Sequence, residues 1–378
     1  MEPLYGDLHA ILSASECNQR GIDVFLSNSC DALGRVHVYG SIWLKLNVFS
    51  INQSHLSILG TAINILFMTV AIALIRPRSI SQVIIAFIVL FSPAVTLALE
   101  RGNNDLIIFI FTALSALLIS LRDRIATLCG LCIVALSSAL KIYPSILFGT
   151  VLLAMKWRSK ELVLILGASA LLVATWLITS LNEILLLKDL VPRPLDHYAT
   201  GAKALFIYLG RPYPQILLIP ETGRLTIFVL FVMACALWLA RRLDLSALQP
   251  MQGSLKFVCF IFGLSILFFT YTINSNYDYR WIFFILLVPY LLHVQQVAAK
   301  NTPTRRMVAL GFICASLVMW TEALRAGRFF GVFNFNVYFN IGRSTFSTEL
   351  VQQFLKELSA WMLFIIMFAF VIKQFSKR

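Results

Sequence analysis

Residues 56–75 read LSILGTAINILFMTVAIALI, and none of these residues is charged. A helix needs about 20 mostly apolar residues to cross a hydrocarbon core about 30 Å thick, because each residue rises 1.5 Å. The stretch therefore predicts a membrane-spanning helix. Ten further stretches qualify or nearly qualify, the one at 144–155 being short: 80–99, 105–121, 125–140, 144–155, 162–180, 224–240, 255–273, 281–298, 307–323 and 355–373.

The composition supports the same fold class. Of 378 residues, 59% are hydrophobic and 13% are charged, whereas soluble domains are about 45–50% apolar and about 25% charged. We expect an all-α polytopic membrane protein with about eleven transmembrane helices. Residues 1–55 would form an extracytoplasmic N-terminal segment, and 56–378 a transmembrane domain with outer loops at 181–223 and 325–354.

Loop charge predicts the orientation, because cytoplasmic loops are rich in Lys and Arg. One side carries 15 basic residues and three acidic ones, so it holds +12 of the net charge of +13. That side, with the C-terminus, is predicted to be cytoplasmic, which leaves 1–55 outside and leads us to expect a further helix before it. The basic residues stand in twos and threes at helix ends, a pattern typical of anchors at an anionic leaflet and unlike a nucleic-acid site.

Polar residues gather at four places on the predicted outer side. They are the N-terminal segment from Tyr5 to Tyr39, and the turns at 100–105, 140–144 and 274–280. Non-helical backbone at membrane depth is tolerated only where protein buries it or where it lines a wet cavity. We expect these turns to line one outward-facing cavity. For any single turn the alternative is structural, since Arg and Lys snorkel from helix ends and Asp and Asn cap helices.

The motifs in these turns resemble a known family. Arg101-Gly102-Asn103-Asn104-Asp105, Lys141-Ile142-Tyr143-Pro144 and Tyr277-Asp278-Tyr279-Arg280 resemble the polyprenyl-phosphate-sugar-dependent glycosyltransferases of GT-C type, in particular glycosyltransferase family 87, which includes bacterial alpha-mannosyltransferases. The resemblance spans roughly 5–295. Asp7 resembles an Asp that opens the family's first outer loop. His37-Val38-Tyr39-Gly40 resembles a later aromatic-Tyr-Pro-Pro stretch, with Gly40 in place of Pro, and the family's first helix is missing upstream.

The resemblance implies a GT-C fold and transfer of a hexose, mannose-like in this family. The donor would be a sugar on polyprenyl phosphate, and the acceptor an extracytoplasmic glycan or glycolipid. The protein would lie in the bacterial cytoplasmic membrane, with its site facing the periplasm. Neither a cofactor nor a metal is expected, since the outer loops contain no Asp-x-Asp pair and the chain no His-x-x-x-His.

Each candidate residue has a proposed role. Asp7 is the expected general base, with Asp105, Glu100 and Asp278 as alternatives. The donor phosphate is assigned to Arg101, Lys141, Tyr143 and Arg280, because fixed cations stabilise a departing phosphate. The substrate-binding candidates are His9, His37, Tyr39, Asn103, Asn104, Asp105, Asp278 and Tyr279. His197, beside Tyr198, is interpreted mainly as a surface residue.

Other features leave alternatives open. Cys17 and Cys30 are disulfide candidates in an oxidising compartment, and Cys129 and Cys132 are interpreted as packing within an apolar helix. The loop at 325–354 is interpreted as an amphipathic segment on the outer leaflet. The alternative functions are a lipid-linked-glycan transporter or flippase, a glycan polymerase or ligase, and a non-catalytic membrane subunit. Acidic residues at predicted helix ends and in loops favour the enzyme over a transporter.

Overall fold

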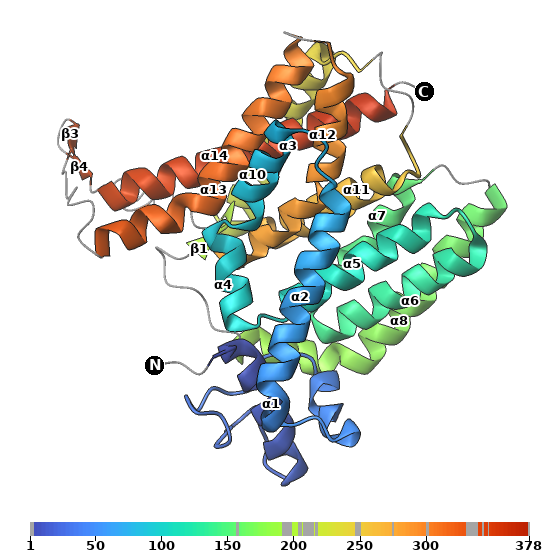
Figure 1. Cartoon of the computed structure of the whole chain (residues 1–378), viewed down its shortest axis with the longest axis vertical. Helices are drawn as coiled ribbons and strands as arrows, with labels where there is room; N and C mark the ends of the chain where they lie inside the picture. The colour runs from blue at the N-terminus through green and yellow to red at the C-terminus, as the bar shows by residue number, and fades with distance from the viewer. Residues whose placement is uncertain are drawn as a thin grey trace. The chain divides into compact units, whose positions relative to one another are not determined.

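The computed structural model of the chain is built almost entirely of helices (Figure 1). It describes residues 4–155, 159–190, 199–202, 206, 215, 218–245, 251–273, 276–299, 302–329, 339–341, 344–346 and 348–376. The chain divides into two compact units, and each is described by itself. The first unit comprises Met1–Arg76, Thr96–Pro192 and Gln252–Ile266, and the second comprises Pro77–Val95, Arg193–Met251 and Leu267–Arg378.

The first unit holds the N-terminal segment and a group of apolar helices. Helices α5, α6 and α8 run side by side (Figure 1), and the Phe67 ring on α2 meets the Phe109 ring on α5 edge-on at 4.9 Å. This unit contains α1 (Gly6–Gln19), η1 (Ser41–Phe49), η2 (Gln53–His55), α2 (Leu56–Ile75), most of α4 (Pro93–Arg101), α5 (Asp105–Ser120), α6 (Arg124–Leu140), η3 (Tyr143–Ser145), α7 (Ile146–Ala154), α8 (Ser159–Leu190) and the first part of α11 (Leu255–Ile273).

The second unit is centred on the C-terminal helix, which packs against two other helices of the unit, α10 and α13. Rings of Phe228, Phe364 and Trp361 fill this core. This unit contains α3 (Ile80–Leu90), β1 (Ala199–Thr200), α10 (Glu221–Arg242), the end of α11, β2 (Asn276–Tyr277), η6 (Asp278–Leu286), α12 (Val288–Val297), α13 (Pro303–Phe329), β3 (Phe339–Ile341), β4 (Ser344–Phe346) and α14 (Thr348–Phe375). β1 pairs with β2 and β3 with β4, both antiparallel.

The helices support a membrane protein, but the structure does not confirm eleven spans. Among the described residues, five helices are long and apolar enough to cross a membrane, or seven if two bent pairs each count as one span. The five are Gln53–Ile75, Val163–Asn182, Glu221–Arg242, Leu255–Ile273 and Val351–Phe375. The bent pairs are Ile80–Leu90 with Pro93–Arg101, and Asp278–Leu286 with Val288–Val297.

Length explains three of the four predicted spans that are not among these candidates. The fourth, at 307–323, lies within α13, which is long enough but is not one of the candidate spans of the described residues. The predicted spans at 105–121, 125–140 and 144–155 correspond to apolar helices of fewer than 18 residues. At 1.5 Å per residue, such helices reach at most about 26 Å, short of a hydrocarbon core about 30 Å thick. The bent pairs have a different cause. Pro93 begins α4 and Pro289 lies in the first turn of α12, and proline breaks a helix because it lacks an N–H donor.

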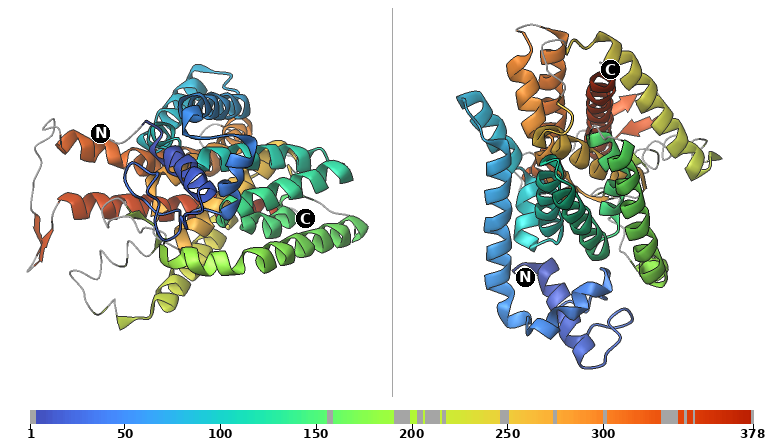
Figure 2. Two further views of the ribbon diagram at one scale, coloured as in Figure 1. Left: turned by 90° about the horizontal axis from the view of Figure 1, so that it is seen from below. Right: turned by 90° about the vertical axis from the view of Figure 1, so that its right-hand side faces the viewer.

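The N-terminal segment lies beside the first turns of α2 (Figure 2). Its helix α1 is largely buried although its hydrophobic pattern is weak. Two polar contacts of the N-terminal segment stabilise this position. The indole Nε1 of Trp43 donates to the Leu140 carbonyl at the end of α6 (3.1 Å), and the backbone of Tyr5 donates to the Glu100 carbonyl (3.2 Å). The segment is therefore anchored at the two turns that follow α4 and α6.

Candidate functional site

The first group of polar residues joins the N-terminal segment to the turn after α4. Arg101 donates to both carboxylate oxygens of Asp7, from Nε at 3.1 Å and from Nη2 at 2.6 Å. Asn103 Nδ2 donates to the same carboxylate at 2.5 Å. The Asp7 side chain is 8% exposed and that of Arg101 is 31% exposed. Asp7 is therefore a buried, oriented carboxylate whose cationic partner reaches the surface.

Close packing holds the start of α1 at this position. Gly102 has a φ of +55°, and a Cβ there would lie 2.9 Å from the Tyr5 Cβ. A Cβ on Gly60 of α2 would lie 2.3 Å from the Tyr5 ring. Tyr5 therefore packs closely against both glycines. This packing fixes the start of α1, so that Asp7, two residues later, contacts Arg101. Tyr5 also hydrogen-bonds Thr61 through its hydroxyl at 3.1 Å.

The second group lies at the start of α5 and the end of α6. The Lys141 ammonium forms an ion pair with Asp105, whose side chain is fully buried, and donates to Asn104 Oδ1 at 2.9 Å. The Tyr143 hydroxyl donates to the same Asp105 oxygen at 2.8 Å. Asn103 connects the two groups, since its Oδ1 accepts from the Asp105 backbone (2.9 Å) while its Nδ2 contacts Asp7.

Aromatic side chains of the N-terminal segment extend this second group. Lys141 Nζ lies 5.7 Å from the centre of the Tyr39 ring, within the range of a cation–π contact. The His37 ring lies 5.9 Å from the Tyr39 ring. Burial lowers the pKa of His37 to about 4, against a smaller opposite effect of the Gly40 and Tyr39 backbone. His37 is therefore neutral at pH 7.

His9 belongs to a separate ionic network within the N-terminal segment. Its Nδ1 lies 3.1 Å from an Asp31 oxygen. Arg35 contacts both Asp31 oxygens at 2.9 Å and donates to the Gly6 carbonyl at 2.8 Å. Although burial opposes it, hydrogen bonding with Arg35 lowers the pKa of Asp31 to about 2. The network holds the backbone next to Asp7.

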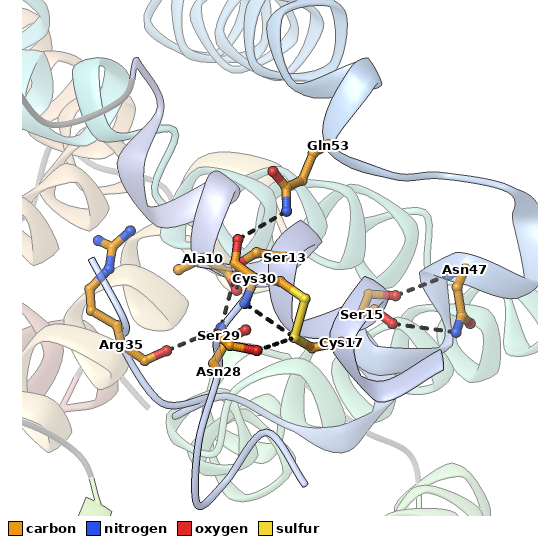
Figure 3. The surroundings of a disulfide bond; sticks show 10 residues. All are labelled: Ala10, Ser13, Ser15, Cys17, Asn28, Ser29, Cys30, Arg35, Asn47 and Gln53. Carbon is orange, nitrogen blue, oxygen red and sulfur yellow. Dashed lines mark hydrogen bonds between the residues drawn. A yellow bond between two sulfur atoms is a disulfide. The ribbon is translucent and has the colours of Figure 1, made fainter. Parts of the chain in front are cut away.

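A disulfide crosslinks the same segment. Cys17, near the end of α1, is bonded to Cys30, and the two Cα atoms are 5.8 Å apart (Figure 3). Gln53, just before α2, donates to the Cys30 carbonyl at 3.2 Å. The bond closes the loop 17–30, which ends directly before Asp31, and links the end of this loop to the helix that carries Asp7. Cys129 and Cys132 on α6 are not disulfide-bonded, and both are exposed, so the predicted packing role is not found.

The fourth polar turn belongs to the second unit. Asp278 is paired with Lys356 of α14, with Nζ–Oδ2 at 2.6 Å. The rings of Tyr277 and Tyr279 stack 5.6 Å apart. Arg280 is half-buried in η6.

The structure thus brings together the predicted residues of three turns within the first unit: Asp7, Arg101, Asn103, Asn104, Asp105, Lys141, Tyr143, Tyr39 and His37. His9 faces Asp31, and the Glu100 side chain is exposed. His197 lies outside the described residues, as do the side chains of the 325–350 part of the predicted amphipathic loop. Within the described residues, no three His, Cys, Asp or Glu side chains gather as a metal site would require. Metal-independent chemistry stays a prediction.

No sequence motif points to a role for Arg35, Lys356 or Glu357. The spacing of Asp31 and Arg35, four residues apart, was an available signal for an ion pair. The predicted helix at 355–373 placed Glu357 at a helix end, but α14 begins at Thr348 and the candidate span at Val351. Lys356 and Glu357 therefore lie well inside the helix, and both are buried.

Comparisons with models of protein families, with curated proteins and with solved structures find no match to this chain.

Proposed function

We propose that the protein is a membrane glycosyltransferase of GT-C type that transfers a hexose, mannose-like as in family 87, from polyprenyl phosphate to a glycan or glycolipid. One observation carries the proposal. The buried Asp7 carboxylate is oriented by Arg101 and Asn103, and Asn103 also links it to the group around Lys141. This pairing of a base with fixed cations is what such a transfer needs.

The proposed reaction uses Asp7 as the proton acceptor. The acceptor hydroxyl oxygen attacks the anomeric carbon, and its proton passes to the carboxylate. An ionised carboxylate only accepts hydrogen bonds, and the donors on Asp7 hold its oxygens in a fixed orientation. The bond between the anomeric carbon and the phosphate oxygen breaks, and the polyprenyl phosphate leaves with the electron pair.

Cations of the site would stabilise the leaving group. A guanidinium carries five N–H donors in a planar fork that suits phosphate oxygens, and part of the Arg101 side chain is exposed. Lys141 and Tyr143 would act from the second group, and Arg280 from the fourth turn. These contacts would be stronger in a water-poor site between helices than in water. Asn104, Tyr39 and Tyr279 are proposed to bind sugar hydroxyls.

The proposed location follows from the charge pattern and the disulfide. Of the net charge of +13, +12 lies on one predicted side, which the positive-inside rule places in the cytoplasm. The N-terminal segment then lies outside, where the Cys17–Cys30 disulfide would persist because that compartment is oxidising. We propose the bacterial cytoplasmic membrane, with the site facing the periplasm.

The test is transfer by the purified protein in detergent. A panel of polyprenyl-phosphate sugars is offered with glycolipid acceptors, and matching polyprenyl-diphosphate sugars serve as the comparison. Transfer from a monophosphate donor with no added metal is the expected result. Transfer from diphosphate donors alone would instead assign the protein to the polymerases or ligases.

Transport of a lipid-linked glycan is the second candidate function. It is favoured by Lys356 and Glu357, because ionisable groups buried inside a candidate span are common in transporters. The two functions separate in one comparison. Sugar transfer proceeds in detergent micelles, whereas transport requires sealed vesicles. Activity that appears only in vesicles, as movement of an unchanged lipid, would favour the transporter.

A further inference from the structure

Two adjacent residues of α14, Lys356 and Glu357, are buried with at most 1% exposed surface. Charged side chains are rarely buried in apolar protein, because taking a charge out of water is costly unless a partner compensates it. Both residues have such partners. One partner, Tyr271, precedes the turn that follows α11, and the other, Asp278, lies within that turn, directly before Tyr279 and Arg280.

Lys356 contacts the turn itself, at Asp278. Its ammonium donates to Asp278 Oδ2 at 2.6 Å and lies 2.5 Å from the other oxygen, so both carboxylate oxygens face one cation. The Lys356 side chain is 0% exposed and that of Asp278 is 4% exposed. Asp278 is the first residue of η6. The pair therefore ties the start of η6 to a helix 78 positions later in the chain.

Glu357 contacts the helix that precedes the turn. It accepts a hydrogen bond from the hydroxyl of Tyr271, near the end of α11, and a second from Gln353 Nε2 at 3.0 Å. Gln353 stands one helical turn before Glu357, so it orients the carboxylate from within α14. Consecutive residues of one helix thus hold the chain before the turn, at Tyr271, and within it, at Asp278.

The backbone changes from strand to 3-10 helix within the turn, since β2 ends at Tyr277 and η6 begins at Asp278. Asp278 is buried against Lys356, while the rings of Tyr277 and Tyr279 stack with an interplanar angle of 12°. Arg280 follows directly and is half-buried. The position of Tyr279 and Arg280 therefore depends on where Asp278 is held.

We propose that Lys356 and Glu357 are positioning residues, which hold the 276–280 turn so that Tyr279 and Arg280 face the polyprenyl-phosphate donor. The inference rests on the proposed function for the identity of that ligand. It adds a specific role for α14, which is to set donor affinity without contacting the donor.

The first experiment removes both charges together, because a single change would leave the partner charge buried and unpaired. The double variant Asp278→Asn with Lys356→Met keeps similar volumes and is expected to fold with near-normal thermal stability. Its KM for the polyprenyl-phosphate donor should rise about tenfold, as expected for loss of a charge-assisted contact, while its acceptor KM stays unchanged. Arg242→Met is the matched control, since it removes a positive charge that lies over Trp238 at the end of α10.

A purely structural role predicts a different result. If Lys356 and Asp278 only stabilise the fold, a double variant of normal stability would have the donor KM of the wild type. This outcome overturns the proposal. Tyr271→Phe tests the other anchor and should raise the donor KM by a smaller factor. Glu357→Gln keeps an oxygen that accepts from Tyr271 and is expected to rescue nearly wild-type kinetics. Loss of activity in Glu357→Gln at normal stability would contradict positioning by a hydrogen bond.

Hydrogen exchange provides a readout that does not depend on activity. Amides within 276–286 should exchange faster in the double variant than in the wild type or Arg242→Met, because local opening becomes easier. If this difference is found but the wild type transfers no sugar, the proposed function fails and the positioning role stands. If transfer occurs but neither exchange nor donor KM changes, the positioning role fails and the function stands.

Discussion

The Asp7 carboxylate and the Arg101 guanidinium, 94 positions apart in the chain, form an ion pair with two hydrogen bonds at 2.6 and 3.1 Å. Bidentate pairs of this kind fix the direction of both groups as well as bringing them together. The pair unites the first two polar turns and gives the candidate base a fixed orientation beside a cation.

Asp7→Asn should abolish most of the transfer activity. The amide keeps the volume of the carboxylate but cannot take the acceptor proton, so the rate should fall by about 10²–10⁴-fold. Initial rates with a polyprenyl-phosphate donor measure the effect. Asp23→Asn is the control, because Asp23 is an exposed carboxylate of the same segment. Near-normal transfer by folded Asp7→Asn would show that another group is the base.

The variant Gly102→Ala tests whether activity depends on the packing of Tyr5 against Gly102, apart from the effect of backbone strain on stability. A φ of +55° costs a residue with a Cβ about 1–2 kcal/mol, and the new Cβ would also press on Tyr5. We expect lower stability together with a loss of activity, because α1 must shift away from Arg101. Gly21→Ala is a close control, since Gly21 has a φ of +78° and nothing within 4 Å of an added Cβ. It should lose stability through the backbone strain alone, about 1–2 kcal/mol, and keep its activity per folded molecule.

His37 should make the protein sensitive to mild acid. Its folded pKa of about 4 lies below the ordinary value of 6.5, so the unfolded chain binds the proton more readily. The stabilisation is present above pH 6.5 and is lost as the pH falls from 6.5 towards 4. At pH 5 the loss is about 2 kcal/mol relative to pH 7. Thermal unfolding at the two pH values measures this difference.

His37→Phe is expected to reduce the difference between pH 7 and pH 5, since a neutral ring replaces the imidazole. His55→Gln should leave it unchanged, because His55 is exposed. An equal loss of stability at pH 5 in the wild type and in His37→Phe would assign the effect to other groups.

Removal of the disulfide should destabilise the N-terminal segment. Cys17 and Cys30 are 13 positions apart, and a loop of that length restricts the unfolded chain by about 3 kcal/mol. The variant Cys17→Ser with Cys30→Ser should unfold at lower temperature, and proteolysis should cut first within 18–40. The double change Cys129→Ser with Cys132→Ser is the control for loss of thiols. Equal protease resistance of the wild type and the Cys17/Cys30 variant would contradict a stabilising role for the bond.

Much of the helical content could be predicted because it depends on local composition. Residues 56–75 are apolar throughout and form one helix, α2, as expected. The number of spans could not be predicted in the same way. Proline at 93 and at 289 breaks two apolar stretches into bent pairs, and the stretch at 105–121 gives a helix of only 16 residues. Hydropathy averages over such breaks and so does not resolve them.

The candidate site was predicted as a set of turns, and its pairings were not. In the structure Asp105 contacts Lys141 and Tyr143, while Arg101 contacts Asp7. Lys356 was missed because its partner, Asp278, is 78 positions away. No pattern in the neighbouring sequence indicates either pairing, because a carboxylate can pair with any cation that the fold brings close to it.

By itself, the sequence determined the helical membrane character of the protein, its asymmetric charge and the turns at which polar groups gather. These are properties of single segments, because apolar residues avoid water and the backbone must satisfy its hydrogen bonds within the segment. Only the tertiary structure decided that Asp7 meets Arg101. That choice depends on the packing of Tyr5 against Gly60 and Gly102, a steric fit between distant parts of the chain that selects one ion pair among several of similar electrostatic energy.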